Sequence, residues 1–274
     1  MRRLSWMLTL GLTLAPVGGA VVTAACGDDG GATGATSGKR VALRTRLEAE
    51  RPGEPFAASK DWTVTLTAAS LSIASLYYYD GPSPIARAAP PASSRWGSLW
   101  QPAVAWAHPG HYQQGTTRGE MLSPWSVDLF AGAADLPVGD GISGLYRSGQ
   151  FNFGAPSAGP AAGELGGAAV RVTGLATRAT STVHFTMSVS LERLSQEVND
   201  GHIKGCIFDE TDVQSDGTVT ITVLPSVWLG YVNFNDVAPG SAEAPTVIQD
   251  GEVAYTLFLS GLTQLSAYRF RFAP

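Results

Sequence analysis

Residues 182–191, Thr-Val-His-Phe-Thr-Met-Ser-Val-Ser-Leu, carry the clearest structural signal in the chain. Apolar side chains stand at every second position from Val183 to Leu191, and Thr, His or Ser fill the positions between them. Successive side chains of a β-strand point to opposite faces, so this alternation predicts a strand with one buried and one solvated face. Because the pattern recurs along the second half of the chain, it decides the fold class.

Further segments of the same kind are separated by turn signals such as Asn199-Asp200-Gly201 and Ser215-Asp216-Gly217. These segments are residues 62–66, 71–79, 142–153, 168–172, 203–208, 218–224 and 266–272. Short, regularly spaced strands favour an antiparallel arrangement. The sequence therefore predicts an all-β chain. We expect an antiparallel β-sandwich, Ig-like or a partly open barrel, with long loops and at most short helices, in one domain over residues 59–274.

The composition supports this fold class and excludes several functions. Charged residues make up 15% of the chain, and Gly and Pro contribute 32 and 17 of its 274 residues, which is typical of strands and turns. The formal net charge is −5 and the basic residues are scattered, so we expect no nucleic-acid partner. The chain has no Gly-x-Ser-x-Gly motif, phosphate-binding glycine loop or zinc-protease motif, and we predict that it is not an enzyme.

The N-terminal segment has the organisation of a secretory leader. Arg2 and Arg3 precede an apolar stretch that runs to about residue 22, and small residues follow. Thr23-Ala24-Ala25-Cys26 resembles the lipobox of bacterial lipoproteins. The resemblance implies a signal peptide over residues 1–25, a lipidated Cys26, and anchoring at the outer membrane or the periplasmic face of the inner membrane. The alternative is an ordinary secretory signal cleaved near Ala25.

Two further segments have the composition of linkers or loops. Residues 27–39 consist mostly of Gly, Ala, Ser, Thr and Asp, and residues 40–58, charged and Pro-containing, read as either an edge strand or more linker. We therefore predict a flexible tether over residues 26–58. Residues 81–102 are rich in Pro, Ala, Ser and Trp and predict a long irregular insertion, a kind of loop that is usually functional or disordered.

His108-Pro109-Gly110-His111 is the strongest chemical motif in the chain. Pro presets the second position of a type II turn and Gly supplies the positive φ of the third, so the first and fourth Cα atoms come within about 7 Å. Two imidazoles on such a turn can converge on one ion, and imidazole suits copper, zinc and nickel. The alternative is a Pro-Gly turn that joins two strands and leaves both histidines in solvent.

Two ligands do not complete a metal site, so other donors must join them. The candidates are His184, His202, Cys206, Glu120, Met121 and Met187. Alternation places His184 on the polar face of its strand, and places His202 and Cys206 together on one side of the next strand. Met187 falls on the apolar face and is expected in the core. A solvated surface histidine and a half-buried free cysteine are the alternatives for the other positions.

Several segments resemble a pattern in secreted bacterial β-sandwich domains that include the MbnP-like, methanobactin-associated copper proteins. The segments are residues 127–130 (Val-Asp-Leu-Phe), 142–154 (Ile-Ser-Gly-Leu-Tyr-Arg-Ser-Gly-Gln-Phe-Asn-Phe-Gly), 174–185 and 227–234. This resemblance spans about half of the chain after the leader. It implies copper held by histidines with an oxidised tryptophan nearby, and so adds Trp106, two positions before His108, to the predicted site.

The sequence thus predicts a lipid-anchored, extracytoplasmic protein that binds copper, with zinc or nickel as alternatives, for acquisition, storage or handling of the metal. The predicted metal ligands are His108, His111, His184, His202 and Trp106. Its expected partners are the membrane, through the anchor, a metal ion and an envelope protein. The alternative is a structural or partner-binding envelope lipoprotein without metal, which presents residues 81–102 or a sheet edge to that protein.

Overall fold

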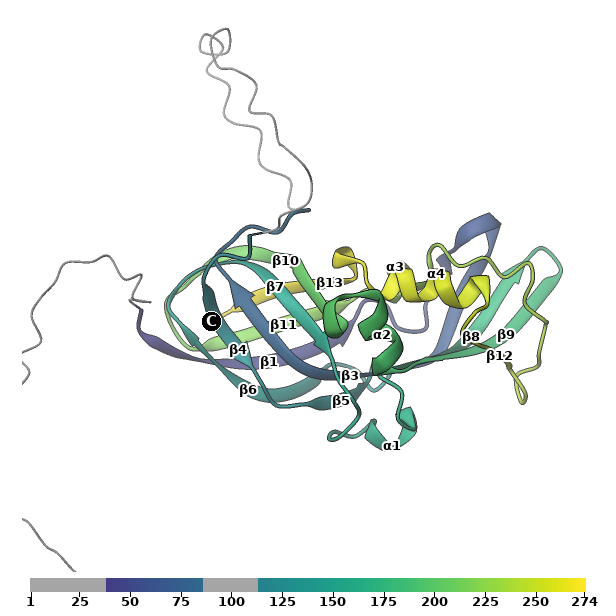
Figure 1. Cartoon of the computed structure of the whole chain (residues 1–274), viewed down its shortest axis with the longest axis horizontal. Coiled ribbons are helices and arrows are strands. Elements are labelled where there is room, and N and C mark those ends of the chain that lie inside the picture. Colours follow the sequence, from purple (N-terminus) through teal and green to yellow (C-terminus); the bar gives the residue numbers. More distant parts are fainter. Residues whose placement is uncertain (1–37, 86–112) are drawn as a thin grey trace, which may run out of the picture. The chain divides into compact units, whose positions relative to one another are not determined.

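The computed structural model describes residues 38–85 and 113–274 (Figure 1). The predicted signal peptide and the first part of the predicted tether, residues 26–37, lie outside the described residues. So do four predicted functional residues, Cys26, Trp106, His108 and His111.

The described residues form thirteen strands. They are β1 Arg40–Ala49, β2 Phe56–Ala57, β3 Thr63–Tyr79, β4 Thr117–Met121, β5 Trp125–Asp128, β6 Ala134–Ile142, β7 Gly144–Phe153, β8 Val170–Arg178, β9 Ser181–Val189, β10 His202–Val213, β11 Gly217–Val223, β12 Thr246–Ile248 and β13 Tyr268–Ala273.

The helices of the described residues are few and short. They are α1 Ala162–Leu165, α2 Leu191–Glu197, α3 Pro225–Leu229 and α4 Val253–Leu262, with 3-10 turns at Ser59–Asp61, Asn199–Gly201 and Leu265–Ala267. Over the ranges that the structure describes, no helix has the length and apolar character needed to cross a membrane.

All thirteen strands join into one sheet. Eleven of them follow the order β12-β9-β8-β3-β4-β6-β1-β11-β13-β10-β7, and β2 and β5 each pair with β3 outside this path. Because β7 also pairs with β3, the eight strands from β3 to β7 in this order close into a ring. Most neighbours are antiparallel, but β1–β11, β10–β13 and β9–β12 are parallel pairs. The prediction of a mostly β chain is confirmed, whereas the sheet is one mixed sheet rather than two antiparallel sheets.

The 17-residue strand β3 produces this arrangement. Its first half, residues 63–71, pairs with β8, and its second half, residues 73–79, pairs with β7. Register shifts after Leu66 and after Ile73 bend the strand between the two partners, so residues 62–66 and 71–79, which the sequence pattern predicts as separate segments, belong mostly to one strand. Figure 1 shows the ring at the end of the sheet that holds β4, β6, β7 and β10, and the β8–β9–β12 extension at the other end.

The folded region begins earlier than the predicted boundary at residue 59. Residues 40–49, assigned to the tether from their charge, form β1, which pairs with β6 on one side and β11 on the other. Val41, Leu43 and Leu47 are buried in the core, while the charged side chains between them face outward. The high charge of this segment therefore belongs to the outer face of an internal strand, because only every second residue of β1 has to be apolar.

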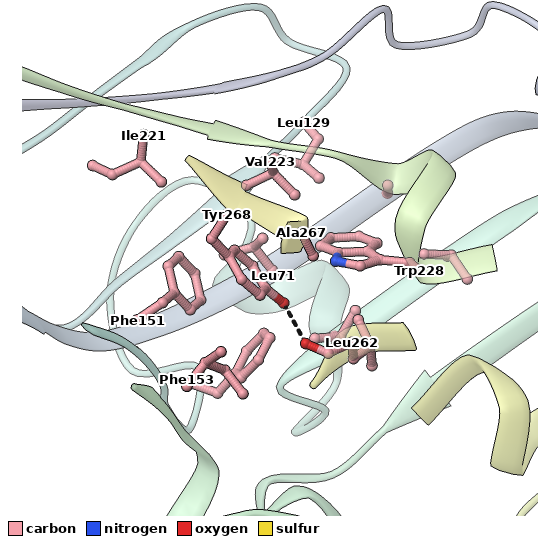
Figure 2. Close-up of a cluster of buried hydrophobic side chains, with 14 of the residues drawn as sticks. Leu71, Leu129, Phe151, Phe153, Ile221, Val223, Trp228, Leu262, Ala267 and Tyr268 are labelled. Atoms are coloured by element: carbon pink, nitrogen blue, oxygen red, sulfur yellow. Dashed lines mark hydrogen bonds between the residues drawn. The ribbon is translucent and has the colours of Figure 1, made fainter. Parts of the chain in front are cut away.

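Aromatic side chains fill the core where the ring meets α3 and α4 (Figure 2). Phe151 stacks on Tyr268 with ring centroids 4.4 Å apart and an interplanar angle of 18°, and Phe153 packs against both rings. The Tyr268 hydroxyl donates a 2.8 Å hydrogen bond to the Leu262 carbonyl at the end of α4. Fully burying side chains of this size stabilises the fold by about 1.5–3 kcal/mol each.

Candidate functional site

Strand β7 is buried on both faces, which is unusual for a strand whose sequence alternates. Phe151 and Phe153 point into the core, so Ser148, Gln150 and Asn152 point to the outside of the ring. These three polar residues, called here the β7 polar row, are nevertheless only 0%, 5% and 2% exposed. Burying a polar group costs free energy unless the group is hydrogen-bonded. The hydrogen-bond partners of the β7 polar row therefore identify the segments that cover this outer surface.

A continuous chain of hydrogen bonds satisfies the amide side chains of the row. Gln150 Oε1 accepts from Gln114 Nε2 at 2.8 Å and from the Tyr79 hydroxyl at 3.0 Å. Gln150 Nε2 donates to Asn152 Oδ1 at 2.8 Å, and Asn152 Nδ2 donates to Ser75 Oγ at 2.8 Å. The network therefore spans β3, β7 and the segment that precedes β4, and it fixes the orientation of both amides.

The same surface holds both stems of the segment between β3 and β4. The stems are residues 80–85, which follow β3, and residues 113–116, which precede β4. Ser148 Oγ donates to the Gly81 carbonyl at 2.6 Å, and Ser83 Oγ donates to the Gly205 carbonyl of β10 at 2.6 Å. Gly81 N donates to the Gln114 carbonyl at 3.0 Å and joins the stems. Residues 86–112 are thus flanked at both ends by residues attached to β7 and β10.

An ion pair closes the base of the stems. One carboxylate oxygen of Asp80 accepts from Thr116 N at 2.7 Å, and the other accepts from Arg118 Nε at 3.0 Å and Nη2 at 2.8 Å. The Asp80 and Arg118 side chains are only 23% and 22% exposed. Charge-assisted hydrogen bonds in such a partly buried place are stronger than those of an exposed ion pair, so this contact keeps the stems together.

His202 is the predicted ligand that lies on this surface. It begins β10 directly opposite Asn152, which places it on the outer face beside the β7 polar row, and it is half-buried. Burial lowers the pKa of His202 below its ordinary value, the Lys204 ammonium lowers it further, and Asp200 opposes both effects. The environment therefore favours the neutral imidazole at neutral pH, which is the form that binds metal ions.

His184 occupies a different part of the molecule. It lies on β9 opposite Leu175, and its backbone N–H donates to the Pro239 carbonyl at 2.7 Å. Across the paired strands, His184 aligns with Thr65 of β3. His202 aligns with Ser75, ten residues further along the same strand. Ten residues of strand correspond to roughly 33 Å. The register therefore sets His184 and His202 far apart along β3.

Cys206 requires a correction. The sequence pattern placed it beside His202, but the register of β10 shifts between Lys204 and Cys206, where Gly205 has a φ of +88°. This bulge reverses the alternation, so Cys206 points into the core, is 0% exposed and donates to the Ile203 carbonyl at 3.4 Å. Burial raises the pKa of its thiol to about 12, which makes it a poor metal ligand.

The remaining candidates divide between core and surface. Met187 is fully buried as predicted, and Met121 is also a core residue at 1% exposure. Glu120 faces outward on β4 beside Tyr77, but two strands separate β4 from β10, which places it roughly 14 Å from the His202 strand. Within residues 38–85 and 113–274, no three His, Cys, Asp or Glu side chains group closely enough to hold a metal ion.

The hydrogen-bonded amides were missed because nothing local distinguishes them. Gln150 and Asn152 alternate with Phe151 and Phe153 as the solvated residues of an ordinary amphipathic strand would. Their burial is revealed only by partners that are distant in sequence, such as Gln114, 36 residues away, and Tyr79, 71 residues away. Neither a protein-family model, nor a curated protein, nor a solved structure matches this chain.

Proposed function

We propose that this chain is a lipid-anchored, extracytoplasmic metal-binding protein of the cell envelope that takes up, stores or hands on copper, with zinc or nickel as alternative metals. One observation carries the proposal. The stems of the segment that contains His108 and His111 are hydrogen-bonded to the outer surface of β7 and β10, and that surface presents His202.

The chemistry of His202 supports its role as the strand-borne ligand. Neutral imidazole is a good donor for copper, zinc and nickel, and the partial burial of His202 disfavours the competing protonated form. Its cross-strand neighbour Asn152 is held by hydrogen bonds to Gln150 and Ser75, so the surface beside the imidazole is ordered before any metal binds. A preordered site loses less conformational entropy when it binds its ligand.

The predicted turn His108-Pro109-Gly110-His111 supplies the other two imidazoles of the proposed site. The anchored stems favour this combination, because fixing both ends of a segment raises the effective concentration of its side chains near the surface that holds it. Trp106, two positions before the turn, is included in the proposed site as the tryptophan near the histidines that the resemblance to MbnP-like proteins implies. His184 is not part of the proposed site.

The proposed anchor fits this arrangement. Residues 27–39 separate Cys26 from the first residue of β1, and a flexible chain of that length spans about 20 Å on average. The folded region would therefore stay close to the membrane surface and meet metal ions that enter the envelope.

The experiment that tests the proposal is isothermal titration of copper, zinc and nickel into the purified protein and its histidine variants. The double variant His108→Ala/His111→Ala and the single variant His202→Ala should each lose at least about tenfold in affinity, which corresponds to about 1.4 kcal/mol. His184→Ala is the matched control and should bind like the wild type.

Two results would decide against the proposal. Unchanged affinity in the double variant would remove the histidine turn from the site. A dialysed wild-type protein that takes up none of the three metals at micromolar concentration would favour the alternative role, in which residues 81–102 or a sheet edge are presented to an envelope protein.

A further inference from the structure

A cavity of about 260 Å³ lies between the β1–β2 loop and α3, away from the β7 polar row. Phe56, Leu66, Phe130 and Pro225 form the apolar part of its lining, and residues 50–55 and Ser226 form the rest. Leu66 belongs to the half of β3 that pairs with β8, whereas the surface with His202 adjoins the other half. This cavity therefore plays no part in the proposed metal site.

Residues 50–55, which join β1 to β2 and line the cavity, are held in a defined shape. Glu50 N donates to the Val223 carbonyl at 2.7 Å, and Glu54 N donates to the Arg51 carbonyl at 3.2 Å. Arg51 has a φ of +46°, a left-handed conformation that non-glycine residues seldom adopt, and two prolines further restrict the loop. Strain of this kind persists only where the surrounding structure imposes it, and it is common at ligand-binding sites.

The size and walls of the cavity select a class of ligand. By volume alone, a cavity of about 150 Å³ accommodates benzene, so 260 Å³ is large enough for a bicyclic aromatic ring system. Phe56 and Phe130 are half-buried and offer ring faces or edges, against which a planar ligand packs favourably.

The rim of the cavity adds a preference for positive charge. Three exposed charged residues line it, Glu50, Arg51 and Glu54, so its formal charge is negative. Arg51 and Glu54 approach only to 4.0 Å with side chains 75% and 65% exposed, which leaves the Glu54 carboxylate available to another cation. The aromatic walls attract cations as well.

From these features we infer that the cavity between the β1–β2 loop and α3 is a binding site for a small, planar aromatic amine. The ring system lies between Phe56 and Phe130, and the ammonium group points to the carboxylates of Glu50 and Glu54. The site is independent of the proposed metal-binding function and of the lipid anchor.

The test compares three probes that share one ring system: tryptamine, indole and indole-3-acetate. Calorimetric titration into the full protein should rank their affinities in that order, with tryptamine about three- to tenfold tighter than indole. The double variant Glu50→Gln/Glu54→Gln should remove the advantage of tryptamine and leave indole unchanged. Phe130→Ala should weaken all three probes, and Glu243→Gln, an exposed acid elsewhere, should change none.

Both glutamates are exposed, so the double variant should fold normally, and near-UV circular dichroism checks the Phe130 variant. The inference is overturned if none of the probes binds at millimolar concentration, or if tryptamine has no advantage over indole. It is also overturned if a folded Phe130→Ala protein binds like the wild type. Amide NMR shifts on titration should centre on the non-proline residues of the lining, such as Gly53, Phe56, Phe130 and Ser226, and shifts spread over the whole surface would count against a single site.

Discussion

Strands β7 and β9 look alike in sequence but differ in their surroundings. Both alternate apolar and polar residues, and both bury the apolar side in the core. On β9 the polar side includes His184, half-buried, and Thr182, exposed, whereas on β7 the residues Gln150 and Asn152 are buried in a hydrogen-bonded network. Alternation therefore determines which face is polar, but contacts from distant segments determine whether that polar face meets water.

The first test concerns the face on which the two strands should behave alike. Phe151 on β7 and Phe185 on β9 are both fully buried against other aromatic rings. Replacing either with Ala should lower the free energy of unfolding by about 3–5 kcal/mol, because each change leaves a cavity in the core. Urea denaturation measures both. A loss below about 1 kcal/mol at Phe151 would mean that the ring interior is not packed as described.

The second test concerns the face on which they should differ. Gln150→Ala removes the hydrogen-bond partner of Gln114, Tyr79 and Asn152, and should destabilise the protein by about 1–3 kcal/mol. The matched change on β9, Thr182→Ala, alters an exposed side chain and should stay within about 0.5 kcal/mol. Equal effects in urea denaturation would contradict the distinction between the two outer faces.

The stems can be tested through the ion pair at their base. Asp80→Asn keeps the size of the side chain but removes the charge that binds Arg118, so we expect a loss of about 1–2 kcal/mol of stability. The control is Glu210→Gln, which disrupts an ion pair with Arg147 whose Glu210 side chain is 59% exposed and should cost less than about 0.5 kcal/mol. Hydrogen exchange of the amides of Gly81 and Thr116 should accelerate only in the Asp80 variant. Unchanged exchange rates would show that the ion pair does not hold the stems together.

The smallest expected effect concerns the protonation of His202. Because its pKa lies below the ordinary value of 6.5 in the folded protein, the unfolded chain binds more protons than the folded one between these two values. Stability without metal should therefore decrease as the pH falls through this window, and His202→Gln should reduce that decrease. A proton NMR titration gives the pKa directly. Lys204→Gln should raise it, since the neighbouring ammonium is removed, and a pKa at or above 6.5 in the wild type would contradict the description of this environment.

Much of the strand content could be predicted from local patterns, since alternation at residues 182–191 or 218–224 reports directly on a buried face. The pairing order could not, because β3 contacts β5, β7 and β8 through residues far apart in sequence. Helix α4 was missed because its apolar residues are not confined to one stripe.

The candidate site was predictable only in part. His202 could be recognised as an outward-facing histidine, but one inserted residue at Gly205 reversed the alternation and moved Cys206 into the core. Predicting the orientation of side chains from alternation assumes a regular strand. Every side chain beyond a bulge is therefore assigned to the wrong face of the sheet. Residues 40–49 illustrate a second reason. Their charged composition predicted a tether, but pairing with β6 and β11 makes them the strand β1.

The most direct measurement is an NMR titration of the isotopically labelled protein with Cu²⁺, whose unpaired electron broadens the signals of nearby nuclei. If the outer surface of β7 and β10 is the metal-binding surface, broadening should begin at His202 and Asn152 and spare His184 and its neighbours on β8. Broadening that begins at His184, or signals that remain sharp at one equivalent of copper, would contradict the assignment of metal binding to this surface.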